Sequence, residues 1–139
     1  MKYPARFIAE PQGGFTVVFP NLEGCVTYGE SLSEAIAMAT EALNGYLESL
    51  DSRSLSVPAP NMLEYTDMHY IPVETRIAFA IRLKQEREKR GMSQQEMAKR
   101  MTMDWKQYQR IENPRKTNPT LATIDRIQQA FGEPLFLNI

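Results

Sequence analysis

The first part of the chain alternates short apolar runs with turn residues. Residues 3–8 and 15–19 are rich in apolar, β-branched and aromatic side chains, and the Pro-Gln-Gly-Gly sequence at 11–14 separates them. Two such runs about a Gly-Gly turn predict a β-hairpin. Pro20 ends the second run, and residues 25–28 form a third short run. We therefore expect three strands at the start of the chain.

The spacing of apolar residues becomes helical after the third run. Ser31, followed three residues later by Glu34, forms a capping box, which is the signature of a helix start. The apolar positions that follow are Leu32, Ala35, Ile36, Ala39, Leu43, Tyr46, Leu47 and Leu50. They predict an amphipathic helix that ends near Ser49 and packs on the strands. Residues 51–60 lack periodicity, and 68–73 predict a fourth strand, which Pro72 confines to a sheet edge or end.

Only helical patterns recur in the second half of the chain. They cover residues 76–90, 94–101, 105–113 and 121–131, and Ser93, Asp104 and Thr120 are the N-caps of the last three. We expect Leu121, Ile124, Ile127 and Phe131 to share one face of the last helix. The fold class is therefore an α+β domain of order β-β-β-α-β over residues 1–73, followed by an all-α domain over 74–139.

Charge divides the chain as sharply as periodicity does. Residues 1–75 hold three basic side chains (Lys2, Arg6 and Arg53) against ten acidic ones, a balance of −7. Residues 76–139 hold thirteen basic against seven acidic, a balance of +6, and the two sums give the −1 of the whole chain. So steep a change indicates two domains with different partners, a cationic protein for the first and a polyanion for the second.

The apolar content and the single cysteine of the chain indicate the cellular compartment that we expect for it. No apolar run approaches the ~20 residues that cross a bilayer, and the N-terminus lacks the apolar core of a signal peptide. A single cysteine, Cys25, excludes an internal disulfide framework, so we expect a reducing, cytoplasmic setting. Domains of roughly 65–75 residues are marginally stable alone, which favours oligomerisation or partner binding.

Two short helices joined by a tight turn, inside a basic helical domain, are the outline of a helix-turn-helix. Residues 93–101 (SQQEMAKRM), Asp104 and residues 110–113 (RIEN) resemble the phage-repressor-like family of helix-turn-helix regulators, over roughly 81–132. Small Ala98 leaves room for the second helix to cross close by. A mini-core of Met97, Met101, Met103, Tyr108 and Ile111 would set the crossing angle.

The resemblance implies that the second helix enters the major groove of operator DNA. The positions it marks as DNA-binding are Gln94, Gln95, Trp105, Lys106, Gln107, Gln109, Arg110, Arg115 and Lys116. Gln94 is placed to grip a phosphate, Lys106 and Gln107 to read guanine and adenine edges, and the loop cations to meet the backbone. Thr102 departs from the glycine common in the family, and Trp105 contacts either DNA or a protein. Arg87 and Glu112 are expected to pair with each other.

The acidic domain carries a second resemblance. Residues 14–35 (GFTVVFPNLEGCVTYGESLSEA) combine a strand, a Phe-Pro turn, a glycine-bearing turn, a Thr-x-Gly step and a Glu-Ala helix start. This order resembles the HicB family of antitoxins, over about residues 3–73. The resemblance implies a partial ribonuclease H-like fold and a partner, a small basic HicA-type toxin that cleaves mRNA. It also implies that the complex represses its own operon.

The toxin-binding residues are less well marked. Exposed acids on the predicted helix, Glu34, Glu41 and Glu48, and the third-strand region are candidates, and a solvated helix face is the alternative. We expect no catalysis, cofactor or metal. Ribonuclease H chemistry needs several carboxylates around two metal ions, and Asn21 stands where relatives often carry aspartate.

Two functions from different classes fit these observations. The first is an antitoxin that also acts as an autorepressor. The second is a stand-alone helix-turn-helix regulator whose N-terminal domain senses a ligand or oligomerises, although no phosphate loop or convergent polar cluster indicates a ligand. Palindromic operators require at least a homodimer, and a homotetramer stays open. The apolar tail at 135–139 is a plausible dimer strand.

Overall fold

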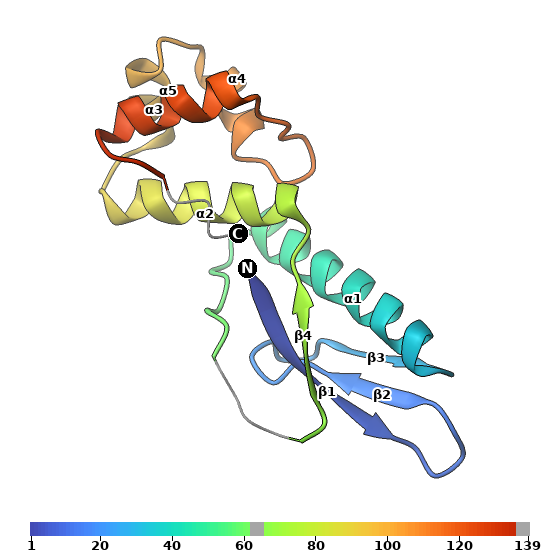
Figure 1. Cartoon of the computed structure of the whole chain (residues 1–139). Coiled ribbons are helices and arrows are strands. Elements are labelled where there is room, and N and C mark those ends of the chain that lie inside the picture. Colours follow the sequence, from blue (N-terminus) through green and yellow to red (C-terminus); the bar gives the residue numbers. More distant parts are fainter. Residues whose placement is uncertain (62–65, 136–139) are drawn as a thin grey trace. The chain divides into compact units, whose positions relative to one another are not determined.

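The chain forms two compact units in a computed structural model, which describes residues 1–61 and 66–135 (Figure 1). Met1–Glu74 is the sheet unit and Thr75–Ile139 is the helical unit. Each unit is described by itself. The β-β-β-α-β order predicted for the first and the helical content predicted for the second are confirmed.

The sheet unit is built on a four-stranded antiparallel sheet with strand order β3-β2-β1-β4. The strands are β1 (Lys2–Ala9), β2 (Phe15–Val18), β3 (Val26–Gly29) and β4 (Met68–Pro72). The hairpin between β1 and β2 turns through Gly13 and Gly14, both at positive φ, which glycine adopts without steric cost. β4 lies at the sheet edge and ends at Pro72, as that proline predicted.

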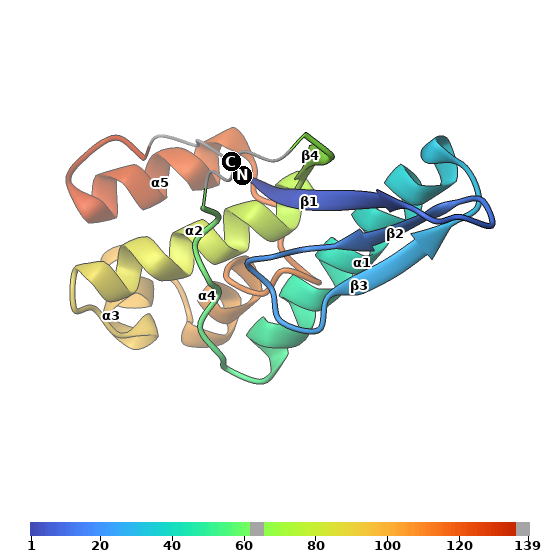
Figure 2. The ribbon, with the colours of Figure 1, turned by 90° about the horizontal axis from the view of Figure 1, so that it is seen from below.

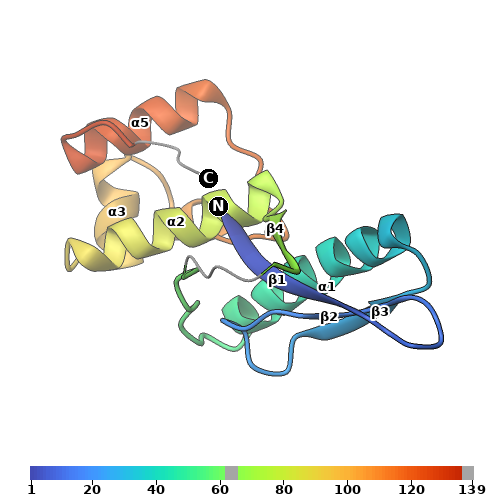
Figure 3. The ribbon, with the colours of Figure 1, turned by 60° about the horizontal axis from the view of Figure 1, so that its bottom comes forward.

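One long helix, α1 (Leu32–Ser52), runs along one face of this sheet (Figures 1 and 3). The Ser31 hydroxyl accepts a hydrogen bond from the Glu34 amide at 3.1 Å, as predicted. The Glu34 carboxylate accepts from the amide of Glu30 at 2.9 Å, whereas the capping box would have it accept from Ser31. The predicted end near Ser49 was wrong by one turn, since the helix continues to Ser52.

The core of the sheet unit lies between α1 and the sheet. α1 contributes residues spaced four apart, which form one row that winds slowly around the helix, and these are Ala35, Ala39, Leu43 and Leu47. The inward orientation predicted for Leu32 and Ile36 is wrong, because both lie on the flank of that row and are exposed. Cys25 is buried, and burial raises the pKa of its thiol to about 11.

The described part of the helical unit, residues 75–135, contains the helices α2 (Thr75–Lys89), α3 (Gln94–Arg100), α4 (Trp105–Ile111) and α5 (Leu121–Phe131) (Figure 2). Ser93 and Glu96 form the predicted capping box, and Thr120 caps α5 by accepting from the Thr123 amide at 3.1 Å. Gly132 ends α5 in the left-handed conformation. α4 is two residues shorter than predicted because Glu112 is already its C-cap.

The core of the helical unit contains the predicted mini-core. Met97, Met101 and Tyr108 are buried, and Met103 and Ile111 pack against them. The inward orientation of Leu121 is wrong: this residue opens α5 and is 84% exposed, whereas Ile124, Ile127 and Phe131 pack inward. Within the predicted tail strand, Leu135 is buried in this core, and residues 136–139 lie outside the described part of the chain.

Candidate nucleic-acid interface and partner-binding unit

The turn between α3 and α4 brings the two helices close together. The Met103 amide donates to the Ala98 carbonyl at 3.0 Å, and Ala98 is buried, so a larger side chain would push the helices apart. Thr102 has φ 53° in this turn, in the left-handed region that favours glycine. The departure noted in the sequence therefore leaves the turn geometry intact and strains one β-branched residue.

Replacing Thr102 with glycine should stabilise the helical unit by about 0.5–1 kcal/mol. The gain is the left-handed strain of a β-branched residue, ~1–2 kcal/mol, less the extra entropy that glycine has in the unfolded chain. Thermal unfolding should show a melting temperature several degrees higher than that of the parent. Thr102→Ala is the matched control, because it keeps a β-carbon in the same conformation and should gain far less. Equal gains in both variants would contradict the strain argument.

A buried ion pair connects α2 to the end of α4. The Arg87 Nε and Nη2 atoms donate to the two carboxylate oxygens of Glu112 at 2.9 and 2.7 Å, and Arg87 Nη1 donates to the Met92 carbonyl at 2.7 Å. Both side chains are buried. The hydrogen bonds to Glu112 raise the pKa of Arg87 further, so the guanidinium stays charged. The predicted pairing is confirmed, and it orients α4 through its C-terminal end.

Two glutamines extend this pair toward the surface. Gln94, the first residue of α3, donates to a carboxylate oxygen of Glu112 at 3.4 Å, and Gln109 of α4 donates to the side-chain oxygen of Gln94 at 3.5 Å. Gln94 is half-buried and Gln109 is exposed. The structure thus brings together two of the predicted DNA-binding residues. The hydrogen bonds of Gln94 to Glu112 and Gln109 hold its side chain in one orientation.

Except for Gln94, the predicted DNA-binding residues lie on the exposed side of α3, α4 and the loop that follows. On α4 only Tyr108 is buried. The exposed set is Gln95, Trp105, Lys106, Gln107, Gln109, Arg110, Arg115 and Lys116. Gln107 also accepts a hydrogen bond from the Asp104 amide at 3.2 Å, so its carbonyl oxygen helps to cap α4. Its side-chain NH2 group is not used in this cap, and its contact with a base stays a prediction.

The segment from Ser93 to Lys116 is electropositive. It holds six basic residues and three acidic ones, a balance of +3, and one of the acids, Glu112, is buried against Arg87. Glu96 and Asp104 stand at helix starts, where they serve as capping residues. The exposed surface of these two helices and the following loop therefore attracts a polyanion.

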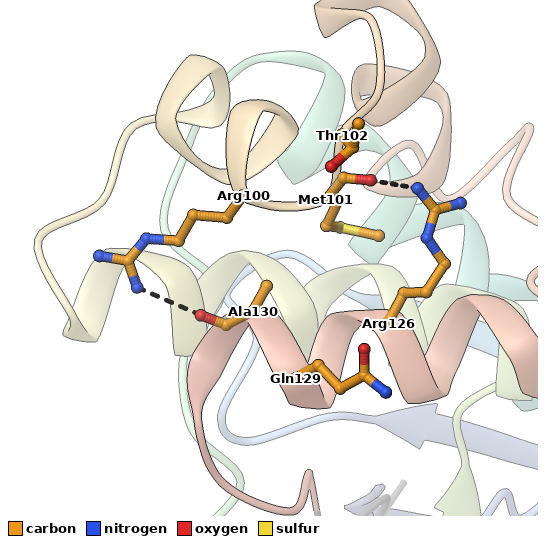
Figure 4. A pocket seen from close by; sticks show the side chains of 6 residues that line it. All are labelled: Arg100, Met101, Thr102, Arg126, Gln129 and Ala130. Carbon is orange, nitrogen blue, oxygen red and sulfur yellow. Dashed lines mark hydrogen bonds between the residues drawn. The ribbon is translucent and has the colours of Figure 1, made fainter.

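Two arginines that sequence reasoning missed connect α3 to α5. Arg126 of α5 donates to the Met101 carbonyl, and Arg100 of α3 donates to the Ala130 carbonyl at 3.2 Å (Figure 4). Each helix therefore supplies a hydrogen-bond donor to a backbone carbonyl at the C-terminal end of the other. With Thr102 and Gln129 the two arginines line a pocket beside the turn. Basic residues near helix ends are the local signal, but the exchange between helices is visible only in three dimensions.

The predicted toxin-facing acids share one side of α1. Glu34, Glu41 and Glu48 are spaced by seven residues, about two helical turns, so they project in nearly the same direction. Glu34 and Glu41 are exposed and Glu48 is half-buried. Only Glu34 and Glu41 are therefore as exposed as predicted, and contact of the three acids with a partner stays a prediction.

Over residues 1–61 and 66–135, no three histidine, cysteine or carboxylate side chains come together in a way that could hold a metal ion. In the same ranges, no helix is long and apolar enough to cross a bilayer.

Both units are similar to known protein families. A family model described as the HicB-like antitoxin of bacterial toxin–antitoxin systems matches residues 3–89, and a helix-turn-helix model matches residues 83–137. Antitoxin HicB of Escherichia coli K12 is 28% identical over 113 residues, which cover 81% of each chain. Antitoxin HicB 1 of Photorhabdus laumondii is 27% identical over all of this chain and 87% of its own length.

Among solved structures, a chain of a HicA3 and HicB3 toxin–antitoxin complex is similar, with a TM-score of 0.45 and 22% identity; the match covers 53% of this chain and 99% of that one. The family model spans more than half of the chain, and a helix-turn-helix follows it. The chain therefore belongs to the HicB-like antitoxin family of bacterial toxin–antitoxin systems, a family of antitoxins and not of enzymes, and it carries a helix-turn-helix domain of the phage-repressor-like type.

Proposed function

We propose that this protein binds and neutralises a small HicA-type ribonuclease toxin and represses its own operon by binding operator DNA. The observation that carries the proposal is that one chain combines a HicB-like unit of charge −7 with a helix-turn-helix unit of charge +6. We assign toxin binding to residues 1–73 and DNA binding to 74–139. Both partners place the protein in the cytoplasm.

Neutralisation follows from electrostatics and steric masking. A toxin that cleaves mRNA needs a basic surface to hold the RNA backbone. An acidic domain is attracted to such a surface, and its bulk keeps RNA away. The same contact brings the toxin to the operator through the helical unit, because both functions reside in one chain.

Operator reading is assigned to the start of α4. Lys106 can donate to the guanine acceptors of the major groove, and the side-chain NH2 group of Gln107 can donate to an adenine acceptor. Gln94 and Gln95, at the start of α3, and Arg115 and Lys116, after α4, would contact phosphates and set the register. Since palindromic operators pair two reading helices, we expect a homodimer or homotetramer, which light scattering distinguishes.

Lys106→Ala and Gln107→Ala should each lower the affinity for operator DNA by about 1–3 kcal/mol, or roughly 5- to 150-fold, because each removes a side chain that binds a base edge. Fluorescence anisotropy at fixed salt, with a non-specific duplex of equal length as competitor, measures the decrease. Lys2→Ala removes the same charge from the sheet unit and is the matched control. If both variants bind the operator as the parent does, α4 is not the reading helix.

The antitoxin role is tested by co-expressing the chain with the small basic HicA-type protein that we expect to be encoded beside it. Co-purification, together with rescue of growth from that protein's toxicity, is the expected result. No complex and no rescue would refute the antitoxin role and would leave a DNA-binding regulator whose sheet unit senses a ligand or oligomerises.

A further inference from the structure

The face of the sheet opposite α1 is unusually apolar near β3. Directly paired residues of an antiparallel sheet point to the same side, and Val18 pairs with Val26 as Thr16 pairs with Tyr28. Ile8 is paired with Thr16 and therefore shares this side. The alternate positions along the same strands belong to the buried side that faces α1, as Val17 does.

Two of these side chains are strongly exposed. Val26 is 55% exposed and Tyr28 is 47% exposed, and both lie on β3, an edge strand. Val18 is half-buried directly beside Val26, and Ile8 of β1 is half-buried on the far side of Thr16 from Tyr28. In an antiparallel sheet covered on one side, the open side is normally polar. We call Ile8, Val18, Val26 and Tyr28 the β3 patch.

Tyr28 is held in place without being covered. Its hydroxyl donates to the Gly13 carbonyl at 3.1 Å, and its ring lies so close to Gly14 that a β-carbon there would overlap the hydroxyl. The β1–β2 turn therefore fixes the ring in one orientation. A pre-positioned aromatic side chain costs little conformational entropy on binding, which is typical of residues that dominate an interface.

The rim of the β3 patch is acidic. Outside α1, residues 7–31 hold three acidic residues, Glu10, Glu23 and Glu30, and no lysine or arginine. Glu23 and Glu30 flank β3 on either side and are exposed. Arg6 of β1 shares this side of the sheet, and Asp67 offsets its charge through an ion pair of 3.1 Å. An apolar centre with a carboxylate rim is complementary to an apolar surface with a basic rim.

We propose that the β3 patch is the surface on which the basic toxin docks, with Val26 and Tyr28 as its apolar anchors. This rests on the proposed function and specifies the interface that it leaves open. A second copy of this chain is disfavoured as the occupant, because it would bring a rim of the same negative charge against Glu23 and Glu30. The acids on α1 then act as a long-range attraction and not as the contact.

Val26→Lys tests the proposal, since it places a charge in the apolar centre and repels a basic partner. We expect about a tenfold or greater loss of affinity for the small basic protein encoded beside this chain, measured by titration calorimetry. Leu121→Lys makes a similar change at an exposed leucine of the helical unit and should leave that affinity unchanged. Val26→Thr preserves shape and β-propensity and should lose less.

Each other outcome has a defined meaning. Circular dichroism and operator binding show whether Val26→Lys is folded; if it is not, Val26→Thr decides, and an affinity equal to the parent's would overturn the proposal. Unchanged toxin affinity in folded Val26→Lys would overturn it as well, and an altered oligomeric state would then assign the patch to contacts between copies. Failure of the parent chain to bind the toxin would instead refute the proposed function.

Discussion

Glu112→Ala should lower the free energy of unfolding of the helical unit by about 3–5 kcal/mol. The change leaves the Arg87 guanidinium buried, charged and without the carboxylate that now accepts three of its hydrogen bonds. Gln94 loses a partner at the same time. Because the core of a unit this small supplies only about 3–5 kcal/mol of stability, we expect the unit to be largely unfolded at 37 °C and to lose operator binding.

Urea denaturation followed by tryptophan fluorescence measures this effect, because the single tryptophan of the chain, Trp105, lies in the helical unit. The informative control is the double variant Arg87→Met with Glu112→Leu. It removes both charges and replaces them with apolar groups, so it should recover much of the stability that the single variant loses. A loss in the double variant as large as in Glu112→Ala would show that shape, and not the unpaired charge, is responsible.

Gly29→Ala should destabilise the sheet unit by about 3 kcal/mol. A β-carbon at residue 29 would overlap the backbone of Ala35 and Glu34, and backbone atoms cannot rotate away as a side chain can. The start of α1 would have to move off β3, which opens the core between helix and sheet. We expect loss of toxin binding, while operator binding by the helical unit is less affected.

Gly45→Ala is the matched control for this second prediction. Gly45 lies within α1, its added β-carbon would meet nothing within 4 Å, and alanine favours a helix over glycine by ~1 kcal/mol. The same chemical change should therefore stabilise the sheet unit at one position and destabilise it at the other. Amide hydrogen exchange of β2, β3 and α1 measures both, and equal protection in the two variants would refute the close approach at Gly29.

The sequence predicted most of the local structure, because the signals that set it are local. Ser31 and Ser93 start helices because each hydroxyl accepts a hydrogen bond from the backbone amide only three residues later. Gly132 ends α5 in a conformation that its own missing side chain permits. The division into an acidic and a basic part follows from counting charges. The family resemblances added the Arg87–Glu112 pair, which links residues 25 positions apart.

The tertiary structure decided which apolar residues are buried and which polar groups meet. Periodicity placed Leu121 and Ile36 on the apolar side of their helices, but each lies outside the area that its neighbours cover. Several contacts join segments that are distant in the sequence. They are the hydrogen bonds of Arg100 and Arg126 between α3 and α5, the contact of Gly29 with α1, and the exposed β3 patch. Such contacts depend on strand order and helix packing, which hydrophobic spacing along one chain does not specify.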